Sequence, residues 1–162
     1  MTGRVLHTIE PFFDQNSRVL ILGTMPSPVS RREGFYYAHP QNRFWRVLAA
    51  VYGAKTPCGT EQKKAFLSER GIALWDVLAS CYIEGASDAS IKNAEPNPIR
   101  YVLERAPIAA IFTTGAKAAQ LYRRLCYPDT GIKAHGLPST SPANRAWPFD
   151  RLVDEYRAIL DV

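Results

Sequence analysis

Apolar positions follow two different periods along this chain, and each period predicts one type of element. Residues 18–23 form a short apolar run that stops at a glycine, which is typical of a strand covered on both faces. Similar runs predict strands at 108–113 and, more weakly, at 132–137. Segment 71–77 fits either a short strand or a strand-like loop.

Elsewhere the apolar residues recur at intervals of three and four, which predicts amphipathic helices. The predicted helices cover residues 42–52, 60–70, 98–105, 115–125 and 148–160. Because strands and helices alternate, the expected fold class is α/β. We expect a three-layer α/β/α sandwich around a central, mostly parallel sheet of about four strands.

The chain length fits a single domain. Its 162 residues, 1–162, include 46% hydrophobic residues, which is enough for one core. Segment 84–98 is long, polar and rich in turn-forming residues. Too little chain follows it to build a second core, so we expect a surface loop rather than a linker between domains.

Polar residues follow the predicted strands at positions that a parallel sheet would bring together. These strand ends are 23–24, 113–115 and 138–139. The loop 34–45, which follows the first of these strands, is crowded with aromatic, amide and basic side chains. Ligands bind beyond the carboxyl ends of such strands, so we expect the functional site at this edge of the sheet.

Charge and cysteine content narrow the function classes. The formal net charge of +5 favours a polyanionic partner such as nucleic acid, although a moderately basic surface explains it equally well. The three cysteines, Cys58, Cys81 and Cys126, are odd in number and widely separated. They exclude a disulfide framework and a four-cysteine metal site within one chain, and we expect reduced packing residues.

Membrane and export signals are missing from the sequence. No run approaches the roughly 18 apolar residues that a membrane span needs. Residues 1–16 lack a basic and then apolar export pattern. We therefore expect an intracellular, cytoplasmic protein that does not engage a membrane.

Four motifs occur in an order that resembles the uracil-DNA glycosylase superfamily. They are Gly-Thr-Met-Pro-Ser at 23–27, Gly-Phe-Tyr-Tyr-Ala-His-Pro-Gln-Asn-Arg-Phe-Trp at 34–45, Ile-Lys-Asn at 91–93 with Pro-Asn at 96–97, and Leu-Pro-Ser-Thr-Ser-Pro-Ala-Asn at 137–144. The resemblance spans nearly the whole chain. It is strongest for the hypoxanthine-DNA (deoxyinosine) glycosylase branch, and the mismatch-specific uracil/thymine glycosylases come next.

The resemblance implies a monofunctional DNA glycosylase of base excision repair. Such an enzyme flips a deaminated base out of DNA, here hypoxanthine first and uracil second, and hydrolyses its glycosidic bond. We expect DNA as the partner, a monomer, and no metal or other cofactor. The alternatives are a uracil or mismatch enzyme of the same fold, a catalytically weak DNA-damage-binding module, and a hydrolase of free nucleosides or nucleotides.

Asn42 is the expected catalytic residue, because the hypoxanthine branch has its important asparagine in this block. An amide does not ionise near neutral pH, so its expected role is to orient the attacking water with its carbonyl oxygen. Alternatively, Asn42 caps the helix predicted to begin there, a position that asparagine favours. The two roles are compatible.

The base pocket is expected from residues around the same block: Thr24, Met25, Phe35, Tyr37 and His39. Tyr37 corresponds to the aromatic residue that stacks on the flipped base in the mismatch-specific relatives, and such stacking contributes about 1–3 kcal/mol per base. Alternatively, the aromatic residues pack this loop against the following helix. His39 either donates to the base or is a structural hydrogen-bonding residue.

DNA contacts are expected from a late loop and from three scattered positions: Ser139, Thr140, Ser141, Asn144, Arg145, Thr24, Ser27 and Lys117. The late loop resembles the DNA-inserting loop of the family. Hydroxyl and backbone N–H groups suit phosphate oxygens, and Arg145 is placed to fill the gap left by a flipped base or to hold the backbone. Alternatively, the loop is a Ser-Pro turn that leads into the last helix.

Two positions depart from the strongest uracil-cleaving relatives. Met25 stands where other branches carry Asp, Glu or Asn, and Leu137 stands where those enzymes carry His. An acidic water activator and an imidazole that stabilises the leaving base are therefore missing from their usual places. The resemblance accordingly implies weak activity on uracil.

Overall fold

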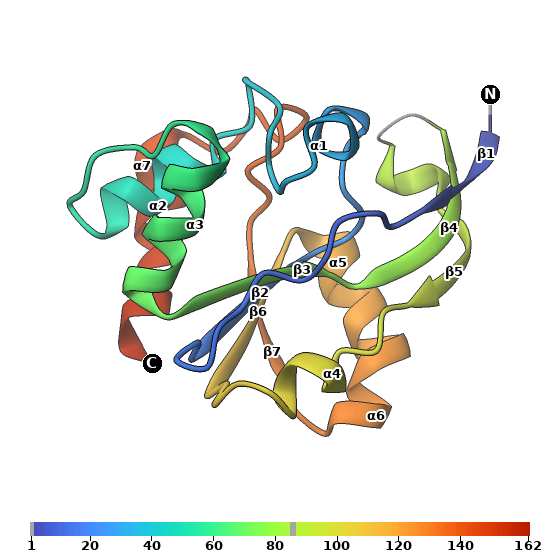
Figure 1. Cartoon of the computed structure of the whole chain (residues 1–162). Coiled ribbons are helices and arrows are strands. Elements are labelled where there is room, and N and C mark those ends of the chain that lie inside the picture. Colours follow the sequence, from blue (N-terminus) through green and yellow to red (C-terminus); the bar gives the residue numbers. More distant parts are fainter. Residues whose placement is uncertain (1, 85–86) are drawn as a thin grey trace.

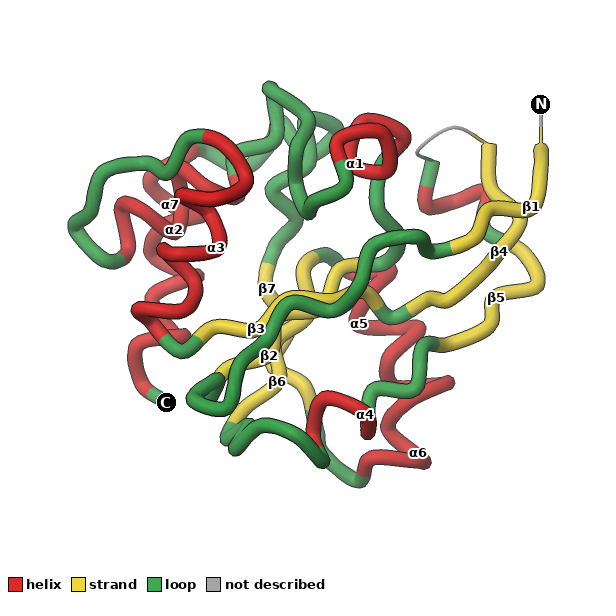
Figure 2. Tube along the Cα trace, viewed as in Figure 1, coloured by secondary structure: helices red, strands yellow, loops and turns green. Residues whose placement is uncertain are grey.

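The computed structural model describes residues 2–84 and 87–162, which form two β-sheets flanked by helices (Figures 1 and 2). The strands are β1 (Thr2–Leu6), β2 (Val19–Gly23), β3 (Ile72–Asp76), β4 (Leu78–Glu84), β5 (Lys92–Pro96), β6 (Ala110–Thr114) and β7 (Ala134–Leu137). The α-helices are α1 (Pro28–Glu33), α2 (Phe44–Val51), α3 (Gly59–Arg70), α4 (Arg100–Leu103), α5 (Ala116–Leu121), α6 (Tyr127–Thr130) and α7 (Phe149–Tyr156). Two short 3-10 helices, η1 (Asp88–Ser90) and η3 (Arg157–Asp161), and a π-helical turn, η2 (Tyr122–Cys126), complete the secondary structure.

The central sheet confirms the predicted α/β fold class. Its four strands run in the order β3-β2-β6-β7, and every neighbouring pair is parallel. Helices α2, α3 and α7 lie on one side of this sheet, and α4, α5 and α6 lie on the other (Figure 1). Every residue of β2 and β3 is buried, as their continuous apolar runs require when both faces are covered.

Helices α2 and α7 build the layer that supports the candidate site. From α2, the side chains of Phe44, Val47 and Leu48 are completely buried, and Leu152 and Tyr156 of α7 are completely buried as well. Each apolar side chain buried in this way stabilises the fold by about 1.5–3 kcal/mol. The loop ahead of α2 is therefore attached to a firmly packed helix.

A second sheet was not predicted from the sequence. Strands β1, β4 and β5 pair antiparallel in the order β1-β4-β5, beside the central sheet (Figure 2). The predicted surface loop 84–98 is wrong in part, because it contains η1 and β5, while its residues 85–86 lie outside the described residues. Strand β5 has four exposed residues and no apolar run, so period-based reasoning had nothing to detect.

Segment 71–77 contains the strand β3, so the first of its two predicted alternatives, a short strand, is confirmed. One helix differs from its prediction for a local reason. The helix predicted over 115–125 leaves the α-helical pattern after Leu121 and passes through η2 into α6. Pro128 explains this change, because proline lacks an N–H and its ring clashes with the carbonyl four residues earlier.

The structure also bears on the predicted burial of the cysteines and on the expected absence of a membrane span. Cys81 and Cys126 are buried, as expected for packing residues, whereas Cys58 is exposed. Within the described residues, no helix combines the length and the apolar character needed to cross a bilayer.

Candidate active site

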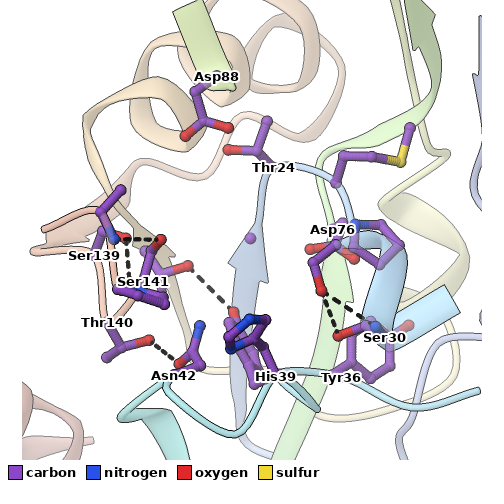
Figure 3. A pocket seen from close by; sticks show the side chains of 18 of the residues that line it. Thr24, Ser30, Tyr36, His39, Asn42, Asp76, Asp88, Ser139, Thr140 and Ser141 are labelled. Atoms are coloured by element: carbon purple, nitrogen blue, oxygen red, sulfur yellow. Dashed lines mark hydrogen bonds between the residues drawn. The ribbon is translucent and has the colours of Figure 1, made fainter. Parts of the chain in front are cut away.

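A cavity of about 340 Å³ opens at the carboxyl ends of the parallel strands, where the ligand site was expected (Figure 3). Gly23 at the end of β2, Asp76 at the end of β3 and Thr114 at the end of β6 contribute to its lining. The loops that follow β2 and β7 supply the remaining walls. Parallel pairing of three strands brings these distant residues to one place.

Most of the predicted site residues line this cavity: Thr24, Met25, Ser27, Tyr37, His39, Asn42, Ser139, Thr140 and Ser141. The others, Phe35, Lys117, Asn144 and Arg145, are not among its lining residues. Nine of the thirteen predicted residues therefore lie around one cavity, but the sequence did not distinguish residues that face the cavity from residues that support its walls.

The carbonyl group of Asn42 is engaged by two protein donors. Its Oδ1 accepts hydrogen bonds from the backbone N–H of Phe44 at 2.9 Å and from the hydroxyl of Thr140 at 2.7 Å. Because a backbone N–H only donates, these contacts identify the oxygen and leave the amide Nδ2 on the other side, pointing toward the cavity (Figure 3). The expected water-orienting role of the carbonyl oxygen is therefore wrong, since both of its lone pairs are occupied. The structure is close to the capping alternative: Asn42 precedes the N-cap residue Arg43, and its Oδ1 accepts the N–H of Phe44, the first residue of α2.

Tyr37 supplies an aromatic wall. Its backbone has φ +53°, a left-handed conformation that is rare for a residue with a side chain, and such strain is often found at functional sites. Its ring stacks on Phe44 with centroids 3.8 Å apart and an interplanar angle of 11°, and its hydroxyl lies 3.2 Å from that of Thr114. Burial, reinforced by the Asp76 carboxylate, raises the pKa of Tyr37, so the hydroxyl stays protonated.

His39 has a structural contact and still faces the cavity. Its Nδ1 accepts a hydrogen bond from the backbone N–H of Gln41 at 3.1 Å, which tightens the turn ahead of Asn42. In the neutral ring this contact places the proton on Nε2. His39 can therefore shape the turn and offer a donor to a ligand at once, so both predicted roles fit the geometry.

Thr140 is not available for DNA, contrary to its predicted role. Its side chain is buried, with only 1% of the residue exposed, and its hydroxyl donates to Asn42. The neighbouring Ser139 and Ser141 do reach the cavity, and Ser139 Oγ accepts the backbone N–H of Ser141 at 3.1 Å. Thr140 therefore positions the asparagine, while the two serines form the accessible part of the loop.

Arg43 fixes the shape of the late loop. Its guanidinium donates to the backbone carbonyl of Trp147 at 2.6 Å and to that of Asn144 at 3.0 Å. The amide of Asn144 donates in turn to the carbonyl of Ser139 at 2.8 Å, so this predicted DNA contact has a structural role inside the loop. Arg145 is exposed beside it and, among the residues that the structure describes, makes no hydrogen bond or ion pair that it would have to give up to bind a phosphate.

Phe35 and Lys117 differ from their predicted positions. Phe35 belongs to the core, with 4% of its surface exposed, and its ring packs against Tyr36 and Trp45. The predicted role of Phe35 in the base pocket is therefore wrong, and the packing alternative holds. Lys117 is half-buried in the first turn of α5, close enough to Asp88 to oppose the rise in carboxyl pKa that desolvation causes.

The sequence reasoning missed two acidic residues that line the cavity. Asp76 ends β3 and is buried, and Asp88 belongs to η1 at the mouth (Figure 3). A signal for Asp76 was present, because a polar residue ends the apolar run 72–75. The Oδ2 atom of Asp76 forms a hydrogen bond of 2.8 Å with Nε2 of His7. No comparable signal marks His7, since it lies 69 positions from Asp76 in the chain.

The comparisons with known proteins agree with this architecture. Residues 10–161 match the family model described as the uracil DNA glycosylase superfamily. A hypoxanthine DNA glycosylase of Methanosarcina barkeri is 34% identical over 136 residues, which cover 83% of this chain and 85% of that relative. A protein of the same name from Methanosarcina acetivorans is 33% identical over 147 residues, covering 90% of this chain and 92% of the relative.

One solved structure has the same fold as this chain. The solution NMR structure of a candidate uracil DNA glycosylase from Methanosarcina acetivorans superposes with a TM-score of 0.79 and 30% identity. The superposition covers 99% of each chain, so the two proteins share the whole fold. With a family model matched over nearly its whole length and relatives of similar extent, this chain belongs to the uracil DNA glycosylase superfamily.

Proposed function

We propose that this DNA glycosylase removes hypoxanthine from DNA by hydrolysis and leaves an abasic site. One observation carries the proposal: the cavity at the strand ends combines the ring of Tyr37 with the inward-pointing amide of Asn42. The relatives named hypoxanthine DNA glycosylase support the choice of base. Uracil is the expected second substrate.

The amide of Asn42 has a chemical task in this reaction. As the glycosidic bond breaks, positive charge develops on the deoxyribose and negative charge on the departing base. A fixed N–H donor that points at an acceptor atom of the base is most valuable at that moment, when the acceptor gains charge. The two hydrogen bonds to Oδ1 hold the amide plane and aim Nδ2 at the base.

Tyr37 and His39 complete the proposed base pocket. One face of the Tyr37 ring is covered by Phe44, so a flipped base would stack on the other face. His39 lies at the cavity wall with Nδ1 engaged, which leaves Nε2–H as a donor. Stacking fixes the plane of the base, and the donors fix its rotation within that plane.

The proposed DNA contacts surround the mouth of the cavity. Ser139 and Ser141 line the wall, Ser27 caps the N-terminus of α1 and also lines the cavity, and exposed Arg145 follows in the late loop. A DNA backbone that passes over these groups would meet hydroxyl donors and a guanidinium. The net charge of +5 supports such an approach.

The proposed reaction needs only water as co-substrate, because hydrolysis of an N-glycosidic bond neither oxidises nor reduces either fragment. No lysine lies among the described residues that line the cavity, so we propose a monofunctional enzyme without Schiff-base lyase chemistry. We expect it to act as a monomer in the cytoplasm, with access to chromosomal DNA.

A panel of labelled oligonucleotides tests the proposal. Each oligonucleotide contains one hypoxanthine, uracil, xanthine or mismatched thymine, and alkali converts every abasic site into a strand break. We expect cleavage to be fastest for hypoxanthine and slower for uracil. Faster cleavage at uracil or mismatched thymine would instead identify the mismatch-specific activity.

DNA binding should weaken as salt rises, and replacing Arg145 by alanine should weaken it further. Each phosphate contact that is lost should reduce the salt slope by about one. Fluorescence anisotropy across a salt series measures both effects. Arg105→Ala is the matched control, because this exposed arginine lies near α4, away from the late loop (Figure 1). Salt-independent binding, or equal effects of both variants, would contradict the proposed contact surface.

Met25→Asn or Met25→Asp should shift the hypoxanthine-to-uracil ratio of release rates toward uracil. Met25 is half-buried and lines the cavity at the position where other branches carry a polar group. Its soft side chain suits a purine, whereas an amide or carboxylate would help to activate water for a poorer leaving group. Single-turnover assays of both bases give the ratio. If folded variants leave the ratio unchanged, Met25 only packs against its neighbours and does not select the base.

A further inference from the structure

The water that attacks the sugar needs an acceptor for its proton, and the residues expected to serve it do not. Both lone pairs of the Asn42 carbonyl oxygen are occupied by protein donors. Met25 lines the cavity with a thioether, which is too weakly basic to take a proton. A neighbouring base speeds such an attack considerably, so the lining of the cavity should supply another one.

Three side chains among the described lining residues can take up a proton near neutral pH: His39, Asp76 and Asp88. Nδ1 of His39 accepts the backbone N–H of Gln41, so the other ring nitrogen carries a proton. Asp76 is only 3% exposed, and its Oδ2 is occupied by His7. Asp88 is the one carboxylate of the three whose two oxygens make no hydrogen bond or ion pair within the described part of the chain.

Asp88 lies at the mouth of the cavity. The cavity shares Asp88, Ser139 and Ser141 with a neighbouring surface groove, so these residues form the rim between the two. In Figure 3 the carboxylate of Asp88 points into the cavity from the end opposite Asn42 and His39. A flipped nucleotide keeps its deoxyribose at the mouth while its base goes inward, because the sugar stays joined to the DNA backbone. Asp88 therefore lies at the depth where water attacks the sugar.

A short turn holds Asp88 in this place. The hydroxyl of Ser90 accepts the backbone N–H of Glu84 at 2.8 Å and donates to the carbonyl of Ser87 at 2.7 Å. The backbone N–H of Ile91 donates to the backbone carbonyl of Asp88 at 3.3 Å. These contacts join η1 to the end of β4 and use the backbone of Asp88 while leaving its carboxylate available.

Two opposing effects set the basicity of this carboxylate. Although Asp88 is an exposed residue, the surrounding protein partly desolvates its carboxyl group and raises the pKa, so the anion takes up a proton more readily. The ammonium group of Lys117 in α5 opposes this rise in the pKa and favours the anion. A carboxylate that stays ionised but has gained basicity is suited to general base catalysis.

We propose that Asp88 is the general base of the reaction and accepts a proton from the water that attacks C1′ of the flipped nucleotide. The inference rests on the proposed function. The water oxygen bonds to C1′ as the bond from C1′ to the base nitrogen breaks, and the electron pair of that bond leaves with the base. The water proton passes to the Asp88 carboxylate and then to solvent, and the departing base takes up a proton from solvent. Asp88 thus does what Met25 has no suitable group to do.

Asp88→Asn tests the inference in single-turnover assays with a duplex that contains one hypoxanthine. The substitution preserves the size of the side chain and removes the base, so release at saturating protein should slow at least about 100-fold. DNA affinity, measured by fluorescence anisotropy, should be unchanged or higher, because a negative charge near the phosphates is lost. A smaller fall in the release rate, or a loss confined to affinity, would overturn the inference.

Asp150→Asn is the matched control. Asp150 is exposed in the first turn of α7 and is not among the described residues that line the cavity. The control removes the same charge from the chain and should leave both the release rate and the affinity unchanged. Equal slowing in the two variants would assign the effect to net charge and overturn the role of Asp88.

The dependence of release on pH distinguishes a base from a structural carboxylate. The wild-type rate should fall toward low pH as Asp88 takes up a proton, and Asp88→Asn should lack this fall. Lys117 and Cys81 interact electrostatically with Asp88, and His39 and Asp76 line the same cavity. All four are present in both proteins, so the difference between the two profiles reports Asp88. Profiles of the same shape would overturn the inference.

Lys117→Gln keeps the inference falsifiable if Asp88→Asn folds poorly. Without the ammonium group the pKa of Asp88 should rise, so the fall of the release rate toward low pH should begin at a higher pH than in the wild type. A fall that begins at the wild-type pH would overturn the inference. If the wild-type protein releases no base from any DNA, the proposed function fails first.

Discussion

Replacement of Asn42 by alanine is expected to slow hypoxanthine release about 10²- to 10³-fold, the usual cost of removing one donor that stabilises developing negative charge. The variant also loses the acceptor for Phe44 N–H and for the Thr140 hydroxyl. A loss of stability of about 1–2 kcal/mol should accompany the loss of activity, as for other helix caps. Single-turnover kinetics and thermal unfolding measure the two effects separately.

Asn42→Asp is the matched control for this prediction. The carboxylate keeps an oxygen for both donors, so the stability should stay near that of the wild type. It replaces the cavity-facing NH₂ by a second oxygen, so base release should fall as far as in the alanine variant. A stable Asn42→Asp protein with wild-type turnover would show that the residue only caps the helix.

Tyr37→Ala should have the second largest effect, with base release about 5- to 150-fold slower, as expected from the loss of stacking worth about 1–3 kcal/mol. Tyr37→Phe is the control, because it keeps the ring on Phe44 and removes only the hydroxyl contact with Thr114. The phenylalanine variant should therefore remain within about threefold of the wild type.

The stacking role can be measured directly. A 2-aminopurine placed beside the damaged base reports base flipping by its fluorescence, and the signal should fall for Tyr37→Ala but persist for Tyr37→Phe. Equal loss in the two variants would assign the effect to the hydroxyl group. A wild-type signal in Tyr37→Ala would leave the ring with a packing role only.

The central sheet was predictable because buried parallel strands have continuous apolar sequences. The runs that became β2 and β6 both end at polar residues or glycine, so the positions of the two strands were clear, although β6 begins two residues later than predicted. The second sheet depends on pairing between residues far apart, such as Thr2 with Glu84. In its strands, apolar and polar residues alternate only weakly or polar residues predominate. No local pattern indicates which of these segments pair with each other.

The position of the candidate site was predictable from the sequence, but the roles of its side-chain atoms were not. The block at 34–45 pointed to Asn42, but its hydrogen bond to Thr140 joins residues 98 positions apart and reverses the role expected for the two amide atoms. The pairing of His7 with Asp76 depends on the second sheet, which the sequence did not indicate. Long-range polar contacts therefore decide which atoms face the base.

The most direct test of the account is to identify both products of one reaction. Purified protein is incubated in excess with a duplex that contains a single hypoxanthine, and mass spectrometry follows the free base and the strand, with Asn42→Ala as the control for contaminating activity. The account predicts free hypoxanthine and an abasic strand in equal amounts from the wild type, and neither from the control within the same time. Tight binding of the duplex without base release, or release from free deoxyinosine as fast as from DNA, would contradict it.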